Sequence, residues 1–469
     1  MSVGLVNFDY NIFEKVAEEL AKEQKISYCF GYVLPKKKKS LSKIKYEGVL
    51  KFFDYKSFNT SLKQNFYFSK EEEYIFFKIF DRLSFNSHNN YLKKKFFQKL
   101  TSYWFEFLTN NSNLKILFFS SVPHTHWDFA LYCVAKKLKI KTYFYSRTSI
   151  SDLIYFKKDF IQYDKNIIKI NKQKNIINFL LLNWKNHKYI LKDKNLSYLG
   201  NLHSKTRTFR FHAICKIKIF FHLYIFLRNS LELISRSISP LPIQDKILSY
   251  NSIPSTIFSI YKKKLNRFNY ILYLLKYSVK NCILNLKDYY EKKNINFFHP
   301  LKKKKYIFFP LHFQPERTTL PEGWRYSDQL SAIKILSKSL PLNWQIIVKE
   351  HPRQLSFDLR NYHYRDLNFY RKLKSIPRVI YLSSDANYDE ILKKCDVTAT
   401  ITGSVTFDGL LQDKPGITFG STWLDKCSSV LLYSGTRSLT NFIKKLKNNK
   451  NINFDLKKFL KENKNYFFY

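Results

Sequence analysis

Residues 397–419 read VTATITGSVTFDGLLQDKPGITF and contain the parts of one strand–helix–strand unit. The β-branched run 397–401 is typical of a buried strand, residues 405–411 have the length and spacing of a short helix, and residues 416–419 predict the next strand. When a helix joins two parallel strands, the turn after the first strand lies at the edge of the sheet where such folds bind ligands. We therefore expect the turn at 402–404 to lie at a binding site.

The same alternation extends outward from this unit over residues 302–448. The predicted strands are 306–313, 344–349 and 379–382, and the predicted helices are 328–340, 366–375, 387–395 and 438–448. Ser327 is the expected N-cap of the helix at 328–340. The pattern predicts a doubly wound, Rossmann-like domain, followed by a closing helix at 455–464.

The N-terminal half shows a weaker version of the same pattern, with strands predicted at 26–34, 115–122 and 141–146 and helices at 71–82, 90–108 and 128–138. Between the halves, residues 191–300 predict long helices rich in basic and aromatic side chains. The expected fold is therefore α/β, with two Rossmann-like domains facing a cleft and a helical middle section. We divide the chain into an acceptor-side domain at 1–190, the helical section at 191–300, a donor domain at 301–450 and a closing helix at 451–469.

Composition narrows the class of protein. The 469 residues are 45% hydrophobic and 18% aromatic, which is sufficient for sizeable cores, and the six cysteines are scattered, so we expect neither a disulfide framework nor a zinc site. No secretory signal and no membrane-spanning helix are predicted. This composition fits a protein of a reducing compartment that needs no cofactor.

The net charge of +45 is compatible with several partners. It could attract nucleic acid, anionic lipid or an acidic substrate, or it could reflect a general abundance of lysine together with Asn, Ile and Phe. No nucleic-acid-binding motif is present, so we expect no nucleic-acid partner. The basic amphipathic stretch 209–228 could lie on an anionic membrane surface, or it could be an ordinary packing helix.

The most polar candidate segment directly follows the predicted strand at 344–349. Lys349, His351 and Arg353 could together hold a phosphate or carboxylate, while Pro352 stiffens the turn and Glu350 adds a carboxylate. The alternative is a charged loop without a binding role.

The turn within the opening stretch is the second candidate. Gly403 permits close approach of the backbone to a ligand, Thr402 or Ser404 could cap the following helix, and free amides at its start would suit a phosphate. Asp408 lies one turn further on. It could point back toward the site, or it could be an acid favoured by the helix dipole at the surface.

The third candidate segment, residues 310–319, also follows a predicted strand. Gln314 and Glu316 could hydrogen-bond the hydroxyls of a sugar or ribose, and we include Glu316 among the catalytic candidates. A purely structural turn is the alternative.

The fourth candidate is the only histidine-rich turn of the N-terminal half. His124, His126 or Asp128 could act as a general base, with His124 and Asp128 preferred, and Asp128 could instead cap a helix. The His-x-His spacing permits a metal pair, but no third ligand is evident, so we expect no metal site.

Together these segments resemble the capsule polysaccharide biosynthesis family, which includes transferases of the acidic sugar Kdo. The resemblance extends over about 305–423 and rests on five segments, which are 314–316, 328–329, 348–352, 401–408 and 414–420. It implies a GT-B-like glycosyltransferase whose C-terminal domain binds the donor nucleotide through His351-Pro352 and Gly403-Ser404. Family members usually carry Glu where this chain has Asp408, so the role of Asp408 is in doubt.

The resemblance also implies partners and a location. We expect a nucleotide-linked sugar donor, with a CMP link favoured, and a lipid-linked or polysaccharide acceptor at the inner face of the cytoplasmic membrane. Two alternatives remain open. One is a teichoic-type glycerol- or ribitol-phosphate transferase, and the other is a non-catalytic polysaccharide assembly or export partner.

Overall fold

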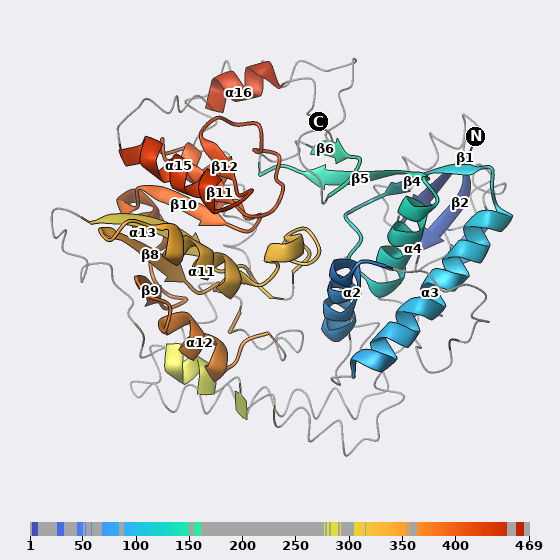
Figure 1. Cartoon of the computed structure of the whole chain (residues 1–469), viewed down its shortest axis with the longest axis horizontal. Helices are drawn as coiled ribbons and strands as arrows, with labels where there is room; N and C mark the ends of the chain where they lie inside the picture. The colour runs from blue at the N-terminus through green and yellow to red at the C-terminus, as the bar shows by residue number, and fades with distance from the viewer. Residues whose placement is uncertain are drawn as a thin grey trace, which may run out of the picture.

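The computed structural model of the chain describes residues 2–7, 26–31, 45–49, 52, 58, 68–83, 89–149, 154–160, 276, 279–280, 283–288, 291, 304–314, 316–352, 354–355, 364–447 and 456–463. The predicted amphipathic helix 209–228 and the candidate residue Arg353 lie outside these residues. Within them the chain forms two α/β halves, each built on its own six-stranded sheet (Figure 1).

The C-terminal sheet has the strand order β12-β11-β10-β7-β8-β9, and each strand is parallel to its neighbours. Its strands are β7 Lys305–Pro310, β8 Trp344–Lys349, β9 Val379–Leu382, β10 Val397–Thr400, β11 Gly416–Thr418 and β12 Val430–Leu432. The chain runs outward from β7 in one direction and then from β10 in the other. This is the Rossmann order. Sheets of this order bind ligands at the switch point, which here lies beyond the ends of β7 and β10, and this region is called the C-terminal crevice.

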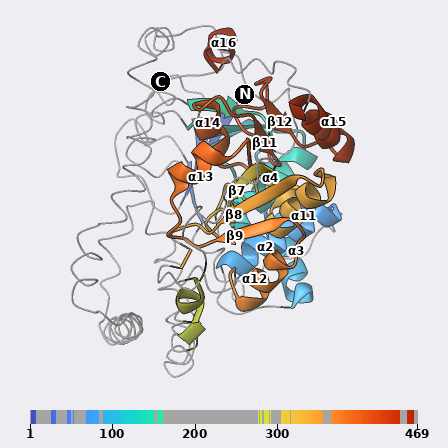
Figure 2. The same cartoon turned by 90° about the vertical axis from the view of Figure 1, so that its left-hand side faces the viewer.

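Helices cover both faces of this sheet (Figure 2). They are α11 Gln329–Ser339, α12 Leu367–Lys374, α13 Tyr388–Lys394, α14 Val405–Leu410 and α15 Thr436–Lys447, followed by α16 Leu456–Glu462. Successive strand side chains point to opposite faces, so Ile307 and Phe309 pack with α11 and α15 whereas Phe308 packs with α13. The predicted doubly wound unit is confirmed, but Ser327 is not the N-cap of α11. Asp328 caps it, because its carboxylate accepts the Leu330 N–H at 3.2 Å.

The N-terminal sheet has the equivalent order β3-β2-β1-β4-β5-β6. Its strands are β1 Ser2–Val6, β2 Ile26–Gly31, β3 Lys45–Gly48, β4 Leu114–Phe119, β5 Lys141–Arg147 and β6 Ile154–Lys157, and only the pair β5–β6 is antiparallel. Helices α2 Lys70–Leu83, α3 Asn90–Asn110 and α4 His126–Lys137 pack on it around an aromatic core. The α/β class with two Rossmann-like sheets is thus confirmed, while the predicted domain boundaries remain predictions.

Strand β6 connects the two halves. Tyr155 lies in a buried cluster made otherwise of C-terminal residues, and Lys157 Nζ donates to the Ser421 carbonyl at 3.1 Å. In the opposite direction, Leu320 is buried in the N-terminal core and Trp324 packs against it. The halves therefore share an interface as well as two separate cores. None of the helices in the described residues is long and apolar enough to cross a membrane.

Candidate functional site

The C-terminal switch point, between the ends of β7 and β10, brings two predicted turns together. His312 follows β7, and its Nε2 lies 2.8 Å from the Thr400 hydroxyl at the end of β10. The Gly403 amide donates to the same hydroxyl at 3.0 Å. A Cβ on Gly403 would stand 2.7 Å from Thr400 Oγ1 and 3.1 Å from His312 Cε1. Glycine is therefore required here by close packing against the imidazole.

His312 is held on several sides. Its backbone N–H donates to Gln329 Oε1 at 2.7 Å, and its carbonyl accepts from Arg365 Nη2 at 3.2 Å. On the other side of the ring, Nδ1 lies 3.6 Å from Glu316 Oε2 and 3.5 Å from Thr318 Oγ1. The side chain is only 6% exposed, so the imidazole is fixed in the crevice rather than free to rotate.

His312 was not among the candidates named from the sequence, although it stands in the segment 310–319. The available signal was its position directly after a buried strand at the switch point. Its importance depends on contacts with Thr400 and Gln329, which are 88 and 17 residues away along the chain.

The two candidates of this segment have different surroundings. Burial raises the pKa of Glu316, but the opposing effect of His312, supported by Thr318 and His351, lowers that pKa below its ordinary value. The side chain remains 40% exposed, so Glu316 is an ionised, accessible carboxylate beside His312. Gln314 is buried, and its amide donates to the Thr319 hydroxyl while its backbone pairs twice with the Gln354 side chain. Gln314 thus shapes the loop.

In the segment after β8, the carboxylate of Glu350 points into the protein. It accepts from the His351 amide at 2.7 Å, from Arg365 Nε at 3.1 Å and from the Tyr370 hydroxyl at 2.7 Å, and it is fully buried. These contacts make Glu350 a support for the turn. His351 remains half-buried beside the ring of Phe313, with Pro352 next to it also half-buried.

Lys349 also points inward, where its Nζ donates to the carbonyls of Ser384 at 2.7 Å and Glu350 at 3.2 Å. Burial lowers the pKa of Lys349 to about 8, even though nearby Glu350, Asp288 and Asp385 act in the opposite direction. The predicted role of Lys349 in donor binding remains a prediction. Its observed contacts join the ends of β8 and β9.

This pKa predicts a pH dependence of stability. Between about pH 8 and the ordinary lysine pKa of about 10.4, the unfolded state binds more protons than the folded state at this position. The contribution of Lys349 to the free energy of unfolding should therefore rise with pH across this window, by up to about 3 kcal/mol. Urea titrations at several pH values should show this rise in the wild type and in the control Lys338→Met, an exposed lysine of α11. If the free energy of unfolding of Lys349→Met rose with pH as much as that of the wild type, the prediction would be contradicted.

The remaining C-terminal candidates lie around the start of α14. The Thr402 hydroxyl donates to the Thr318 carbonyl, linking the two loops of the crevice. Ser404 is exposed and makes no capping hydrogen bond with its side chain, and α14 has six residues. The Asp408 carboxylate accepts from the Tyr388 hydroxyl at 2.6 Å. Asp408 therefore holds α13 and α14 together.

The N-terminal sheet has its own switch point, between β1 and β4. Here Asp128 is fully buried and forms a capping box at the start of α4, accepting from the Thr125 amide at 2.8 Å and from Asn7 Nδ2 at 3.1 Å. His124 is half-buried, with Nδ1 2.9 Å from the Val122 carbonyl. Because a carbonyl only accepts, Nδ1 carries the proton and Nε2 of the neutral ring bears the lone pair that a general base requires.

The capping geometry of Asp128 predicts a large effect on stability. Asp128→Ala removes the cap and leaves the buried amide of Asn7 without this acceptor, so we expect the free energy of unfolding to fall by about 2–3 kcal/mol. The matched control is Asp366→Ala, an exposed acidic cap of α12 that should cost about 1 kcal/mol. If urea unfolding showed the same loss of free energy of unfolding in both variants, the hydrogen bond to Asn7 and the burial of Asp128 would contribute nothing to stability.

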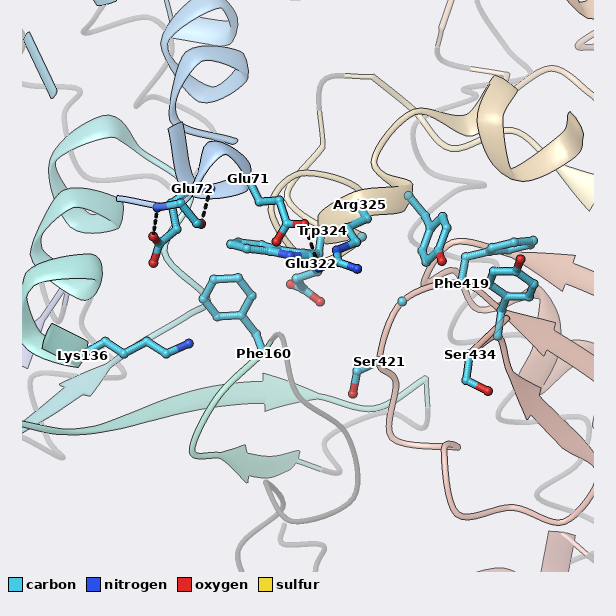
Figure 3. A pocket seen from close by; sticks show the side chains of 15 residues that line it. Glu71, Glu72, Lys136, Phe160, Glu322, Trp324, Arg325, Phe419, Ser421 and Ser434 are labelled. Atoms are coloured by element: carbon cyan, nitrogen blue, oxygen red, sulfur yellow. Dashed lines mark hydrogen bonds and ion pairs between the residues drawn. The ribbon is translucent and has the colours of Figure 1, made fainter. Parts of the chain in front are cut away.

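A cavity of about 500 Å³ lies between the halves (Figure 3). It is lined by α2 and α4 on one side and by the loop 322–326 and the ends of β11 and β12 on the other. None of the site residues predicted from the sequence lines it. The cavity nevertheless adjoins the crevice, because the Gly420 amide in its wall donates to the Ile401 carbonyl at 2.8 Å. Among the described residues, no group of three His, Cys, Asp or Glu side chains could hold a metal ion.

Comparison with solved structures gives low similarity. Methanocaldococcus jannaschii UDP-GlcNAc 2-epimerase is 14% identical, with 96% of this chain and 94% of that chain covered and a TM-score of 0.26. The beta Kdo 2,7 transferase KpsC of Thermosulfurimonas dismutans is 11% identical, with 71% and 78% covered and a TM-score of 0.27. The beta Kdo 2,4 transferase KpsC of the same organism is 15% identical, and the alignment covers 31% of this chain and 44% of that chain at a TM-score of 0.22.

No curated protein matches the chain in sequence. The family comparison is more informative. Residues 249–427 match the model described as capsule polysaccharide biosynthesis protein, and this match includes both loops of the C-terminal crevice. Over this segment, the resemblance to the capsule polysaccharide biosynthesis family that was expected from the sequence is confirmed.

Proposed function

We propose that the protein is a glycosyltransferase of capsule or surface polysaccharide synthesis, which transfers a sugar from a nucleotide-linked donor to a lipid-linked or polysaccharide acceptor. One observation carries the proposal. At the switch point of the C-terminal sheet, a buried imidazole is packed against a glycine backbone and lies beside an ionised carboxylate. This is the position at which Rossmann-like sheets bind nucleotides.

The residues of the crevice suit a donor phosphate. His351 offers a ring N–H group, and the backbone at Gly403 permits close approach of the phosphate oxygens. The ring nitrogens of His312 face Thr400 and Glu316, so this imidazole positions the groups around the donor. Donors held in fixed positions stabilise the negative charge that develops on a departing nucleotide phosphate. Glu316 keeps the His312 ring oriented through Nδ1, while Gln314 and Glu350 hold the two loops in place.

The acceptor hydroxyl must lose its proton during transfer, and His124 is the residue we assign to receive it. Nε2 of the neutral His124 ring bears the lone pair, since Nδ1 donates to the Val122 carbonyl. Asp128 supports this turn as the N3 residue of the capping box whose N-cap is Thr125. The donor group and the base would then come from different halves, as transfer between two separately bound substrates requires.

We further propose a CMP-linked donor of an acidic, Kdo-like sugar and action at the inner face of the cytoplasmic membrane. The support is the capsule polysaccharide family match and, for an anionic membrane surface, the net charge of +45.

The test separates donor binding from chemistry. Thermal-shift titrations with CMP-, CDP-, UDP- and GDP-linked compounds should show stabilisation by one nucleotide class. His351→Ala should weaken this binding at least tenfold, whereas His124→Ala should bind the donor as the wild type does and lose turnover by about 10²–10⁴-fold. Turnover of CDP-glycerol but of no sugar nucleotide would overturn the proposal in favour of the teichoic-type transferase. Nucleotide binding unaffected by His351→Ala would contradict the assigned site.

A further inference from the structure

The cavity between the two halves has the wall composition of a binding site rather than of an interface gap. Trp324 and Phe160 stand close together on its near side, with ring centroids 6.3 Å apart (Figure 3). A second aromatic group forms the wall toward β11 and β12, where the Tyr326 ring lies 5.4 Å from both Phe419 and Tyr433. Two aromatic walls with polar groups between them are typical of small-molecule sites.

Trp324 has an unusual backbone conformation. Its φ angle is +44°, a left-handed value that a bulky L-residue rarely adopts. Such a conformation persists only when the surroundings enforce it, and it recurs at ligand sites. Here it holds a half-exposed indole against the cavity, between the two halves of the protein.

The charges of the cavity contrast with those of the chain. Its lining carries three carboxylates (Glu71, Glu72 and Glu322) and two cations, in a protein of net charge +45. Both cations already have anionic partners. Arg325 pairs with Glu71 at 2.7 Å across the two halves, and Lys136 pairs with Asp159 at 3.2 Å. Two of the carboxylates are paired as well, since Glu71 is the partner of Arg325 and Glu322 lies 3.0 Å from Arg317 Nε. Glu72 pairs with no cation among the described residues, so an anionic ligand would meet only paired cations and would face this one carboxylate.

Aromatic faces pack well against the C–H faces of a pyranose ring, and carboxylates accept hydrogen bonds from sugar hydroxyls. We infer that this cavity binds a sugar unit that carries no negative charge. On the proposed function, that unit belongs to the acceptor, because the negatively charged nucleotide would be excluded and the cavity adjoins the donor crevice. One hydrogen bond joins them, from the Gly420 amide in the cavity wall to the Ile401 carbonyl.

Saturation-transfer NMR on the full-length protein tests the inference with three probes of equal length: maltotriose, chitotriose and trigalacturonate. We expect transfer from the protein to the ring protons of an uncharged probe, and weaker or no transfer to trigalacturonate. Trp324→Leu should weaken binding of the uncharged probe about tenfold, and Tyr326→Leu should act in the same direction. Tyr91→Leu, an exposed aromatic of α3, is the control and should change nothing.

Trp324 also packs against the N-terminal core, so Trp324→Leu could disturb folding as well as binding. Tyr326→Leu therefore tests the aromatic walls independently. Glu72→Gln tests the charge argument separately, because glutamine can still accept the Ser69 amide in the cap of α2 while the negative charge is lost. This variant should bind trigalacturonate better than the wild type does. Preferential binding of trigalacturonate by the wild type, no binding of either uncharged probe, or binding insensitive to both aromatic variants would overturn the inference. Nucleotide titration of the same samples distinguishes that outcome from failure of the donor site.

Discussion

Replacing His312 with alanine is expected to lower kcat/KM about 10²-fold, because the imidazole positions Thr400 and Glu316 at the donor site and misplacement of positioned groups is costly. The imidazole is buried in the crevice, bridges toward Thr400 and Glu316, and is fixed through its backbone by Gln329 and Arg365. Initial rates with the nucleotide-linked donor identified by thermal shift provide the measurement.

The glycine beside the ring offers an independent approach to the same position. Gly403→Ala retains the imidazole, but the added methyl group would stand 2.7 Å from Thr400 Oγ1 and 3.1 Å from His312 Cε1. The Thr400 side chain and the ring must therefore shift. We expect a loss of about tenfold, since small displacements of a positioned group are costly. Activity of His312→Ala within threefold of the wild type would exclude the crevice as the reaction site.

Loss of Arg365 should produce the largest change in stability. Its guanidinium is 3% exposed and lies 3.1 Å from the fully buried carboxylate of Glu350. Arg365→Met leaves that carboxylate with the Tyr370 hydroxyl and the His351 amide but without its ion-pair partner, and breaking a buried pair in this way costs about 3–5 kcal/mol. Urea unfolding should show the transition at a clearly lower concentration.

The double variant Glu350→Gln/Arg365→Met distinguishes an uncompensated charge from lost packing. Removing both charges should recover part of the stability, because the desolvation of an unpaired carboxylate is then absent. The guanidinium also stacks on Phe369, with Cζ 4.1 Å from the ring centroid, and methionine retains part of that contact. A double variant no more stable than Arg365→Met would mean that the charge is not the cause.

The sequence predicted the C-terminal sheet more closely than the N-terminal one. Strands 344–349 and 379–382 have the predicted bounds because each is a short apolar run buried on both faces. The prediction missed β1, β3 and β6 in the N-terminal sheet and β12 in the C-terminal sheet. Strand β1 is five residues at the start of the chain, with Gly4 at its centre, so its central place in the sheet depends on pairing with β2 and β4. Strand β6 places Tyr155 and Lys157 on one face, and both side chains are buried through contacts with the other half of the protein.

The site was predictable in location but not in the direction of each side chain. Polar turns after strands were recognised, and the structure brings those after β7, β8 and β10 to one edge of the sheet. Sequence alone does not show that Glu350 points toward Arg365 and Tyr370, which are 15 and 20 residues further on. Nor does it reveal that Asp408 reaches Tyr388. These directions are set by tertiary contacts that no local pattern encodes.

The most direct test of the central claim, that the crevice between β7 and β10 binds the donor nucleotide, is photo-crosslinking with a diazirine derivative of the nucleotide selected by thermal shift. Peptide mapping should place the label within residues 311–319 or 400–404, and excess unmodified nucleotide should abolish it. Labelling confined to peptides that line the cavity between the halves, such as those of α2 and α4, would contradict the claim, and so would labelling outside the C-terminal sheet altogether.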